Sequence, residues 1–151
     1  MLGHWGEGKL DEKLLTQTRL LKKYINLLEK VAHTEKNVFL KDEILTAAAE
    51  RYLQLAIETC INIGNRIIAL EQIDRNLPPP ETYVEIFETM FKIGLINEQQ
   101  LNNYRKMARF RNKLVHVYWE IDHETVYEII TNNLSDLKEF LNIVVSYLQK
   151  N

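Results

Sequence analysis

The sequence has few of the residues that stabilise small proteins through disulfide bonds or metal sites. Its 151 residues include one cysteine, three prolines and five glycines. The single cysteine, Cys60, cannot form a disulfide within the chain, and no cysteine or histidine spacing matches a zinc site. The prolines stand together at 78–80 and form the one clear linker. The sequence therefore excludes the disulfide-rich and zinc-stapled classes of protein.

The sequence also lacks a run of about 18 apolar residues, which a membrane-spanning helix would require. Its first residues show neither the basic start nor the apolar stretch of a signal peptide. With 46% hydrophobic and 26% charged residues, the composition is that of an ordinary globular domain. We therefore expect a cytoplasmic, metal-free protein with no membrane partner, whose 151 residues build one domain around one core.

Charge is nearly balanced over the whole chain but uneven along it. The formal net charge is −2. Residues 99–119 contain five Lys or Arg and no Asp or Glu, so this segment carries +5 and the rest of the chain carries −7. The overall balance argues against a protein that coats nucleic acid. The local excess indicates an anionic ligand near 99–119.

Apolar residues recur at every third or fourth position along most of the chain, which is typical of amphipathic helices. We expect helices over about 10–33, from Asn37 or Asp42 to about 74, from 82 to 94, from 97 towards 119, and from 122 onward. Asn97 with Gln100 resembles a capping box that begins the fourth helix. Residues 1–9 hold three of the five glycines and show no periodicity. We predict a flexible tail at 1–9 and one helical domain at 10–151.

The second of these helices is long for a small bundle, roughly 45–50 Å at about 1.5 Å per residue. It is apolar over more of its circumference than one neighbouring layer needs, which suggests contacts both within the chain and across a dimer. Glu58, Asn62 and Asn65 form a polar line along it. This line is either a solvated edge or a set of hydrogen-bond partners for Arg111 or a ligand.

The fourth helix carries the residues best suited to chemistry. On a helical wheel with about 100° per residue, Arg111 interrupts an apolar stripe that includes Tyr104 and Tyr118. A guanidinium stays charged and is costly to bury unpaired, so this position needs an anionic ligand, an acidic partner or an interface. A second, polar face lies about 100–160° away. It contains Arg105, Arg109, Asn112 and His116.

One ideal helix aims Arg111 and His116 poorly at one phosphate. They are separated by about 140° and about 7.5 Å of rise, so their side chains diverge. One solution is a two-fold axis at which two motif helices meet, with one residue supplied by each chain. The other is a local distortion at 115–118, where β-branched and aromatic residues weaken the helix.

The arrangement Arg111, four residues, His116, one residue, Tyr118 resembles the R-x4-H-x-Y motif of the HEPN superfamily, specifically of HepT-like toxins. The resemblance extends to 51–58, to the Pro-Pro-Glu-Thr-Tyr turn at 79–83 and to 119–122, and covers the chain from about residue 10 onward. It implies an all-α, antiparallel bundle of about five helices, a homodimer, and a metal-independent ribonuclease without cofactor. It also implies a nucleotidyltransferase antitoxin of the MntA type as partner.

The roles implied by the resemblance agree with the chemistry of the residues. RNA can be cleaved without a metal when its own 2′-hydroxyl attacks the adjacent phosphorus, which needs a base that titrates near neutrality and a cation for the phosphorane charge. His116 and Arg111 fit these roles, and Asn112 could orient the imidazole or donate to a phosphate oxygen. RNA-binding cations would be Arg105, Arg109 and Lys113. Tyr118 is the expected acceptor of AMP from the antitoxin, and the adduct would pair with Arg111 and block the site.

Other interpretations of the same residues remain open. Without the resemblance, a His and a Tyr near the end of an amphipathic helix are usually packing residues, and an Arg in the apolar stripe usually pairs with a carboxylate. The main alternative function is a catalytically silent helical module that binds a nucleotidyltransferase and positions its substrate. The presence of Arg111, Asn112 and His116 together favours catalysis. A purely structural bundle explains the helices but not the charge of 99–119.

Overall fold

The computed structural model describes residues 11–150, and over this range it contains helices and no strand. The helices are α2 (Glu12–Ala32), α3 (Lys36–Lys41), α4 (Glu43–Glu71), α5 (Tyr83–Lys92), α6 (Glu98–His116), the 3-10 helix η1 (Tyr118–Glu120), α7 (His123–Asn132) and α8 (Leu134–Lys150). The all-α fold class is confirmed. The predicted tail at 1–9 lies outside the described residues. Within 11–150, no helix combines the length and apolar character needed to cross a bilayer.

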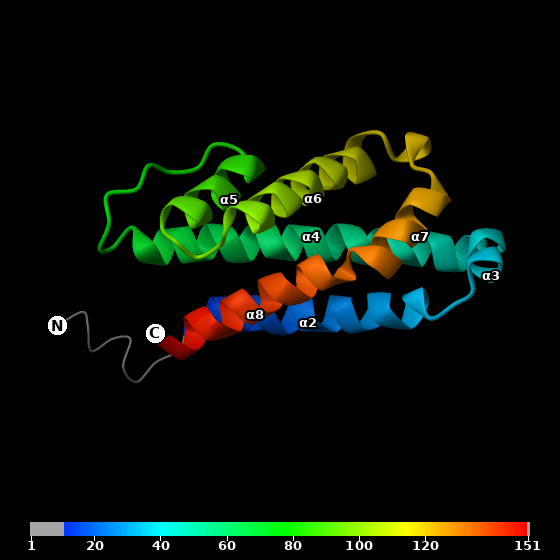
Figure 1. Cartoon of the computed structure of the whole chain (residues 1–151), viewed down its shortest axis with the longest axis horizontal. Helices are drawn as coiled ribbons and strands as arrows, with labels where there is room; N and C mark the ends of the chain where they lie inside the picture. Colours follow the sequence, from blue (N-terminus) through cyan, green and yellow to red (C-terminus); the bar gives the residue numbers. More distant parts are fainter. Residues whose placement is uncertain (1–10, 151) are drawn as a thin grey trace.

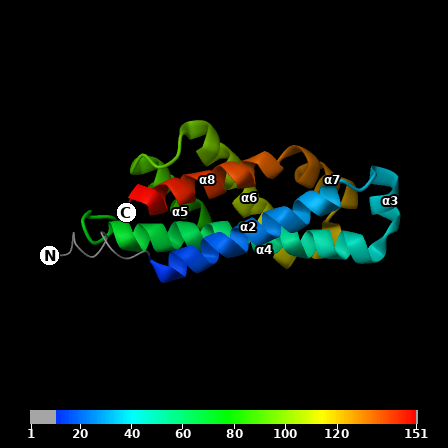
Figure 2. The same cartoon turned by 90° about the horizontal axis from the view of Figure 1, so that it is seen from below.

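The long helix α4 is the centre of an elongated bundle (Figure 1). It contacts each of the other six α-helices that the structure describes. Helices α2 and α8 lie along one side of α4, and α5 and α6 lie along the other (Figures 1 and 2). The twelve buried residues of α4 are therefore covered within the chain. Its wide apolar circumference does not by itself require a dimer.

Helix starts predicted from the sequence are confirmed. The expected N-cap side chains each accept a backbone hydrogen bond: Asp42 for α4, Thr82 for α5, Asn97 for α6 and Asp122 for α7. Asn97 and Gln100 form both halves of a capping box, which fixes where the motif helix begins. Gly94 has a φ of 83°, a left-handed conformation that favours glycine after the end of α5.

Two elements differ from the prediction. A separate short helix, α3, precedes α4 and buries Phe39. The last helix, expected to run without interruption from 122, is divided at Asn133 into α7 and α8. The Asn133 carbonyl accepts a hydrogen bond from the Asp136 N–H at 3.0 Å, which begins the new helix. Consecutive Asn132 and Asn133 explain the break, because asparagine side chains compete for backbone hydrogen bonds inside helices.

Close packing holds α6, the helix that carries Arg111 and His116, in place. Gly64 lets α5 approach α4, since a Cβ at this position would lie 2.6 Å from Cγ2 of Ile86. Three buried rings then join α5, α6 and α8. Tyr104 lies 5.5 Å from Phe87 and 5.2 Å from Phe140, measured between ring centroids. The direction of α6 is thus set by contacts on its apolar side, while its opposite side faces solvent.

Asp11 ties the beginning of α2 to α4. Its Oδ1 accepts a hydrogen bond from the Leu14 N–H at 2.8 Å, as the N-cap, and another from Nε of Arg66 at 3.2 Å. The hydrogen bond from Arg66 is the main reason that the pKa of the Asp11 carboxyl is lowered, and burial opposes it. Asp11 therefore has two separable roles, as a cap and as a charge.

We predict that Asp11→Asn destabilises the fold at neutral pH by about 1 kcal/mol, because asparagine keeps the cap but loses the ion pair. The folded-state pKa of Asp11 is lowered, so its contribution is present above the unfolded-state pKa and is lost as the pH falls through the folded-state pKa. Urea unfolding at about pH 7 and about pH 3 should therefore show a smaller loss of stability for the variant than for the wild type. Asp11→Ala should cost more at neutral pH, since the cap is lost too. An equal loss on acidification in wild type and Asp11→Asn would contradict the assignment.

Candidate active site

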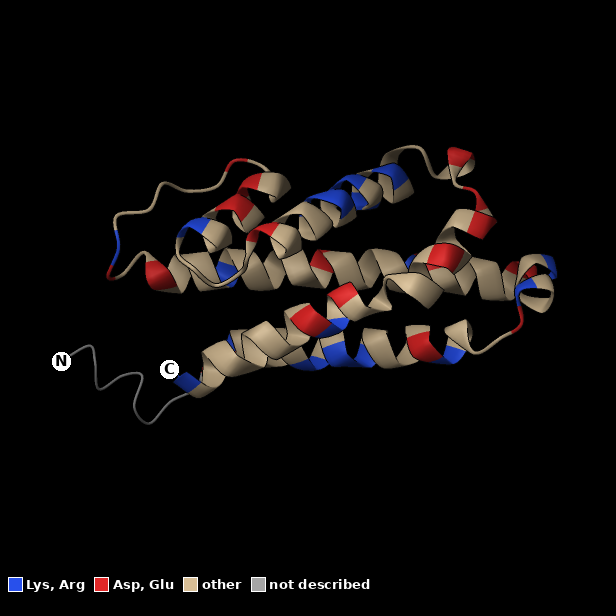
Figure 3. Ribbon diagram, in the orientation of Figure 1, with Lys and Arg blue, Asp and Glu red and all other residues tan. Residues whose placement is uncertain are grey.

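The predicted site residues lie on α6, most of them on its C-terminal half, and immediately after it. Lys and Arg residues follow one another along this half of α6, and acidic residues lie on the neighbouring α5 (Figure 3). The charge excess at 99–119 thus becomes a basic surface on one helix. It is the most concentrated basic feature of the ribbon in this view.

Arg111 is held by residues from three helices. Its Nε donates to Oε2 of Glu58 on α4 at 2.9 Å, and its Nη2 lies 2.8 Å from the same oxygen. Its Nη1 donates to Oδ1 of Asn112 at 3.3 Å. Its guanidinium carbon lies 5.1 Å from the centroid of the Tyr83 ring on α5, a cation–π contact. We call Glu58, Tyr83 and Asn112 the Arg111 clamp; within it the Arg111 side chain is only 16% exposed.

Glu58 supplies the carboxylate that the sequence required for Arg111. Of the polar line on α4, Glu58 is half-buried, whereas Asn62 and Asn65 are exposed. Gln54, one turn before Glu58, donates from Nε2 to Oε2 at 3.0 Å. The line therefore divides into one hydrogen-bond partner of Arg111 and a solvated edge. Both of the interpretations offered by the sequence are partly correct.

Two members of this arrangement were not identified from the sequence. Gln54 precedes Glu58 by four residues on the same helix, and this spacing was a usable signal. Tyr83 follows the proline linker and reaches Arg111 across 28 positions of sequence, so no periodicity points to it. Only the packing of α5 beside α6 brings this ring to the guanidinium.

His116 is the last residue of α6, and its side chain is exposed. Val117 then leaves the helical conformation, with φ −136° and ψ 41°. Over residues 11–150, no hydrogen bond or ion pair joins His116 to Arg111 or to Asn112. The structure thus leaves His116 apart from Arg111, as the divergence on the helical wheel predicts. It pairs Asn112 with Arg111, although the wheel placed Asn112 on the face of His116.

Tyr118 does not continue the helical face of Arg111. The wheel placed it there, but α6 ends at His116 and Tyr118 belongs to η1. The weak helix predicted at 115–119 explains this end. Tyr118 and Trp119 are 67% and 68% exposed, and their rings lie edge to face with centroids 5.4 Å apart. The Tyr118 side chain is therefore accessible to another macromolecule.

The three predicted RNA-binding cations are not equivalent. Nη2 of Arg105 pairs with Oε2 of Glu88 on α5 at 2.8 Å, and its Nη1 donates to Oδ1 of Asn102 at 3.3 Å. Arg109 and Lys113 are exposed, and within the described chain neither forms an ion pair. Two of the three cations are thus available to a phosphate without breaking an existing contact.

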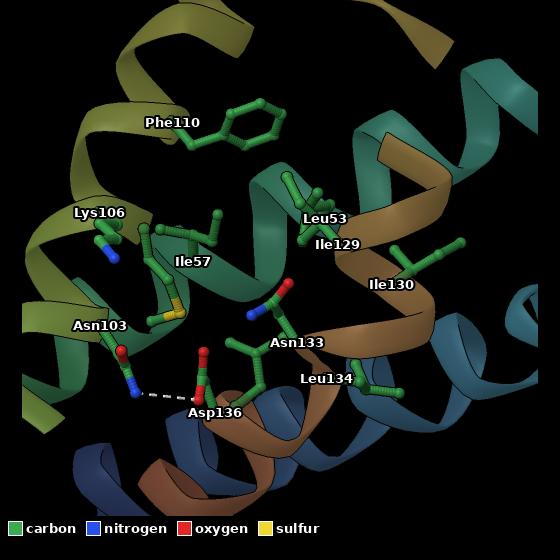
Figure 4. A pocket seen from close by; sticks show the side chains of 12 residues that line it. Leu53, Ile57, Asn103, Lys106, Phe110, Ile129, Ile130, Asn133, Leu134 and Asp136 are labelled. Atoms are coloured by element: carbon green, nitrogen blue, oxygen red, sulfur yellow. Dashed lines mark hydrogen bonds between the residues drawn. The ribbon is translucent and has the colours of Figure 1, made fainter. Parts of the chain in front are cut away.

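A crevice of about 290 Å³ opens beside α6, between α4, α7 and the start of α8 (Figure 4). It is lined by Leu53, Ile57, Asn103, Lys106, Met107, Phe110, Ile129, Ile130, Asn133, Leu134, Asp136 and Leu137. Asn103 donates to Oδ1 of Asp136 at 3.2 Å, and burial is the main reason that the pKa of Asp136 is raised. None of the predicted site residues lines this crevice. It is an apolar surface separate from the Arg111 clamp.

Other groups in the described chain offer little chemistry. Cys60 is fully buried, and burial raises the pKa of its thiol, so it is not an available nucleophile. Within residues 11–150, no three His, Cys, Asp or Glu side chains are grouped as ligands for a metal ion. The clamp and the exposed end of α6 are therefore the strongest candidate site.

Comparison with known proteins places this chain in a family. A family model described as "Ribonuclease HepT-like" matches residues 21–144. An mRNA nuclease HepT from Shewanella oneidensis is 24% identical over 135 residues, which cover 89% of this chain and 98% of the relative. A tRNA nuclease HepT from Aphanizomenon flos-aquae is 24% identical over 139 residues, covering 91% of this chain and 92% of the relative.

Solved structures show the same fold. A tri-AMPylated HEPN toxin from Shewanella oneidensis, solved in complex with an MNT antitoxin, has a TM-score of 0.80 and 23% identity over 91% of this chain and 99% of the toxin chain. A cytosolic protein of unknown function from Bacillus subtilis has a TM-score of 0.78 and 21% identity over 93% of this chain and 92% of its own. The family match spans most of the chain and includes the whole of α6. The chain therefore belongs to the HepT-like ribonuclease family.

Proposed function

We propose that this chain is a ribonuclease toxin that cleaves RNA without a metal ion. The observation that carries the proposal is the Arg111 clamp, which holds one guanidinium beside Asn112 on a helix where two further cations, Arg109 and Lys113, are exposed. Such a surface suits a phosphodiester, because exposed cations attract the RNA backbone while a fixed guanidinium can contact one phosphate. The relatives named as mRNA and tRNA nucleases support the same substrate class.

In the proposed reaction, His116 removes the proton from a ribose 2′-hydroxyl, and the oxygen attacks the adjacent phosphorus. The P–O5′ bond then breaks, the departing O5′ takes up a proton from water, and the products carry a 2′,3′-cyclic phosphate and a 5′-hydroxyl. Arg111 stabilises the additional negative charge that develops on the phosphate oxygens. Asn112 uses Oδ1 to hold Arg111, which leaves its side-chain NH₂ to donate to a phosphate oxygen.

We predict that His116→Ala and Arg111→Ala each reduce RNA cleavage by at least about 100-fold, the usual effect of losing a general base or a charge-stabilising donor. Cleavage of a labelled RNA by the wild type should persist in EDTA, and mass spectrometry should find 2′,3′-cyclic phosphate ends. His33→Ala and Arg19→Ala, at exposed positions of the first helix and its C-cap, are the matched controls and should cleave normally. Cleavage by either site variant at the wild-type rate would refute the assignment, and 3′-hydroxyl products would refute the nucleophile.

The site is proposed to be shared by two chains. Arg111 points into its own bundle, towards α4, whereas His116 is exposed at the end of α6. Within one chain, therefore, the Arg111 guanidinium and the His116 imidazole do not meet at one phosphate. A two-fold axis beside α6 would let a second copy of the chain supply one of the two groups. The crevice beside α6 offers an apolar surface for this contact, because eight of its twelve lining residues are apolar.

We expect the protein to sediment as a dimer at micromolar concentration. Phe110→Glu should shift it towards monomer, because this change puts a charge among the apolar residues of the crevice. Val38→Glu is the matched control, since Val38 is an exposed apolar residue on α3, away from the crevice, and its change should leave the dimer intact. A wild-type protein that is monomeric and fully active would remove the shared-site proposal.

Control of the activity is proposed to act through Tyr118. Its hydroxyl oxygen would attack the α-phosphorus of ATP on an MntA-like nucleotidyltransferase antitoxin, with loss of its proton and release of pyrophosphate. The 67% exposure of Tyr118 supports this role, as does the tri-AMPylated state of the similar toxin. Tyr118 follows His116 by two residues. The new phosphodiester would therefore occupy the end of α6, where an RNA phosphate has to bind.

We predict that incubation with ATP, magnesium and the cognate nucleotidyltransferase adds one or more adenylyl groups to the peptide containing Tyr118 and stops RNA cleavage. Tyr118→Phe should fold, cleave RNA and escape inhibition, because only the acceptor oxygen is removed. Tyr24→Phe, on the first helix, is the control that should still be modified and silenced. Silencing of Tyr118→Phe together with an adduct elsewhere would assign control to a different residue while leaving the ribonuclease proposal in place.

The alternative function is a helical module that binds a nucleotidyltransferase without cutting RNA. One observation favours it: the Glu58 carboxylate offsets the charge of Arg111 in the isolated chain. A purified protein that binds the nucleotidyltransferase but cleaves no RNA would select this alternative.

A further inference from the structure

The hydrogen bonds of Arg111 leave one part of its guanidinium without a protein acceptor. An arginine side chain has five N–H groups. The Nε–H and one N–H of Nη2 face Oε2 of Glu58, at 2.9 and 2.8 Å, and one N–H of Nη1 faces Oδ1 of Asn112 at 3.3 Å. Within the described chain no further acceptor contacts Arg111. Two N–H groups, one on each terminal nitrogen, are therefore left for a ligand.

The carboxylate that directs Arg111 is itself fixed. Oε2 of Glu58 also accepts a hydrogen bond from Gln54 at 3.0 Å, and both residues lie on α4, which contacts each of the other six described α-helices. The Tyr83 ring on α5 covers the guanidinium at 5.1 Å. The direction of Arg111 is therefore set by α4 and α5, although the residue belongs to α6.

We propose that Glu58 is a positioning residue of the site, which turns Arg111 so that its two remaining N–H groups meet two oxygens of one scissile phosphate. This inference rests on the proposed ribonuclease function. Two donors, one on each terminal nitrogen, match the bidentate contact that arginine makes with phosphate. Glu58 weakens the general attraction of Arg111 for anions, so it does not improve the binding of RNA. Its contribution is to orient the Arg111 guanidinium before the reaction begins. Such preorganisation stabilises the transition state more than the bound substrate.

This role predicts opposite effects on binding and on catalysis. Glu58→Gln removes a negative charge, so KM for RNA should stay the same or fall, because phosphate attraction increases. The kcat should fall by about tenfold or more, since a misdirected catalytic group loses rate even when the substrate binds. A purely structural role for Glu58 would instead lower kcat only in proportion to the loss of folded protein, which thermal unfolding measures.

A matched control is available on the same face of the bundle. Glu88 on α5 pairs with Arg105 on α6 at 2.8 Å, so Glu88→Gln removes the same charge from a neighbouring arginine outside the clamp. Its kcat should stay within about twofold of the wild type. Glu58→Asp, which keeps the charge on a shorter side chain, should recover part of the rate that Glu58→Gln loses.

The experiment combines kcat and KM for wild type, Glu58→Gln, Glu58→Asp and Glu88→Gln with a direct measurement on the arginine. The Nε–H NMR signal of Arg111, assigned through its loss in Arg111→Lys, should be protected from exchange in wild type and lost in Glu58→Gln. Glu58→Gln that cleaves RNA at or above the wild-type rate overturns the positioning role and leaves the ribonuclease proposal standing. A wild type that cleaves no RNA refutes the proposed function and the catalytic role with it. The NMR signal then still decides whether Glu58 directs Arg111.

Discussion

The site depends on one physical constraint, the burial of the charged Arg111 guanidinium within an apolar stripe. Arg111 is 16% exposed, and a charge in such a place destabilises the fold unless an opposite charge meets it. Glu58 meets it from α4, so the ion pair fixes how far α6 is displaced along the central helix. A shift of one helical turn, about 5.4 Å, would separate the pair and bury two unmatched charges. The contact that orients the candidate catalytic group therefore also sets the register of the helix that carries it.

The two flanks of α6 have different properties. On the flank that faces α4 and α5, charged groups meet in pairs, Arg111 with Glu58 on α4 and Arg105 with Glu88 on α5. On the other flank, the crevice is mostly apolar, and two of its four polar members, Asn103 and Asp136, are hydrogen-bonded to each other. Arg109 and Lys113 are exposed between these flanks. One helix can therefore offer cations to an RNA backbone and an apolar surface to a second protein, because the two surfaces do not overlap.

The sequence predicts well what is decided locally. The N-caps Asp42, Thr82, Asn97 and Asp122 are confirmed, because capping depends on residues within one turn. The wheel also shows that Arg111 needs an anionic ligand, an acidic partner or an interface, and the polar line on the second helix offers Glu58 as one candidate. The wheel does not show that Tyr83 covers the same guanidinium, because that contact depends on how α5 packs beside α6. The break at Asn133 escapes the periodicity for a related reason: the apolar spacing continues across it while the backbone does not.

The low helix propensity of the residues at the end of α6 affects the proposed control of the site. If the helix continued for two more residues, Tyr118 would lie on the face of Arg111, beside a guanidinium that is mostly buried. A hydroxyl in that position would be hard for a modifying enzyme to reach. β-branched Val115 and Val117 favour the end of the helix at His116, and Tyr118 then stands 67% exposed in η1. The residues that end the helix thus allow the proposed site to combine a fixed arginine with an accessible tyrosine. Arg111 remains fixed inside the bundle, and the tyrosine that would receive the inhibitory group is left within reach of a partner.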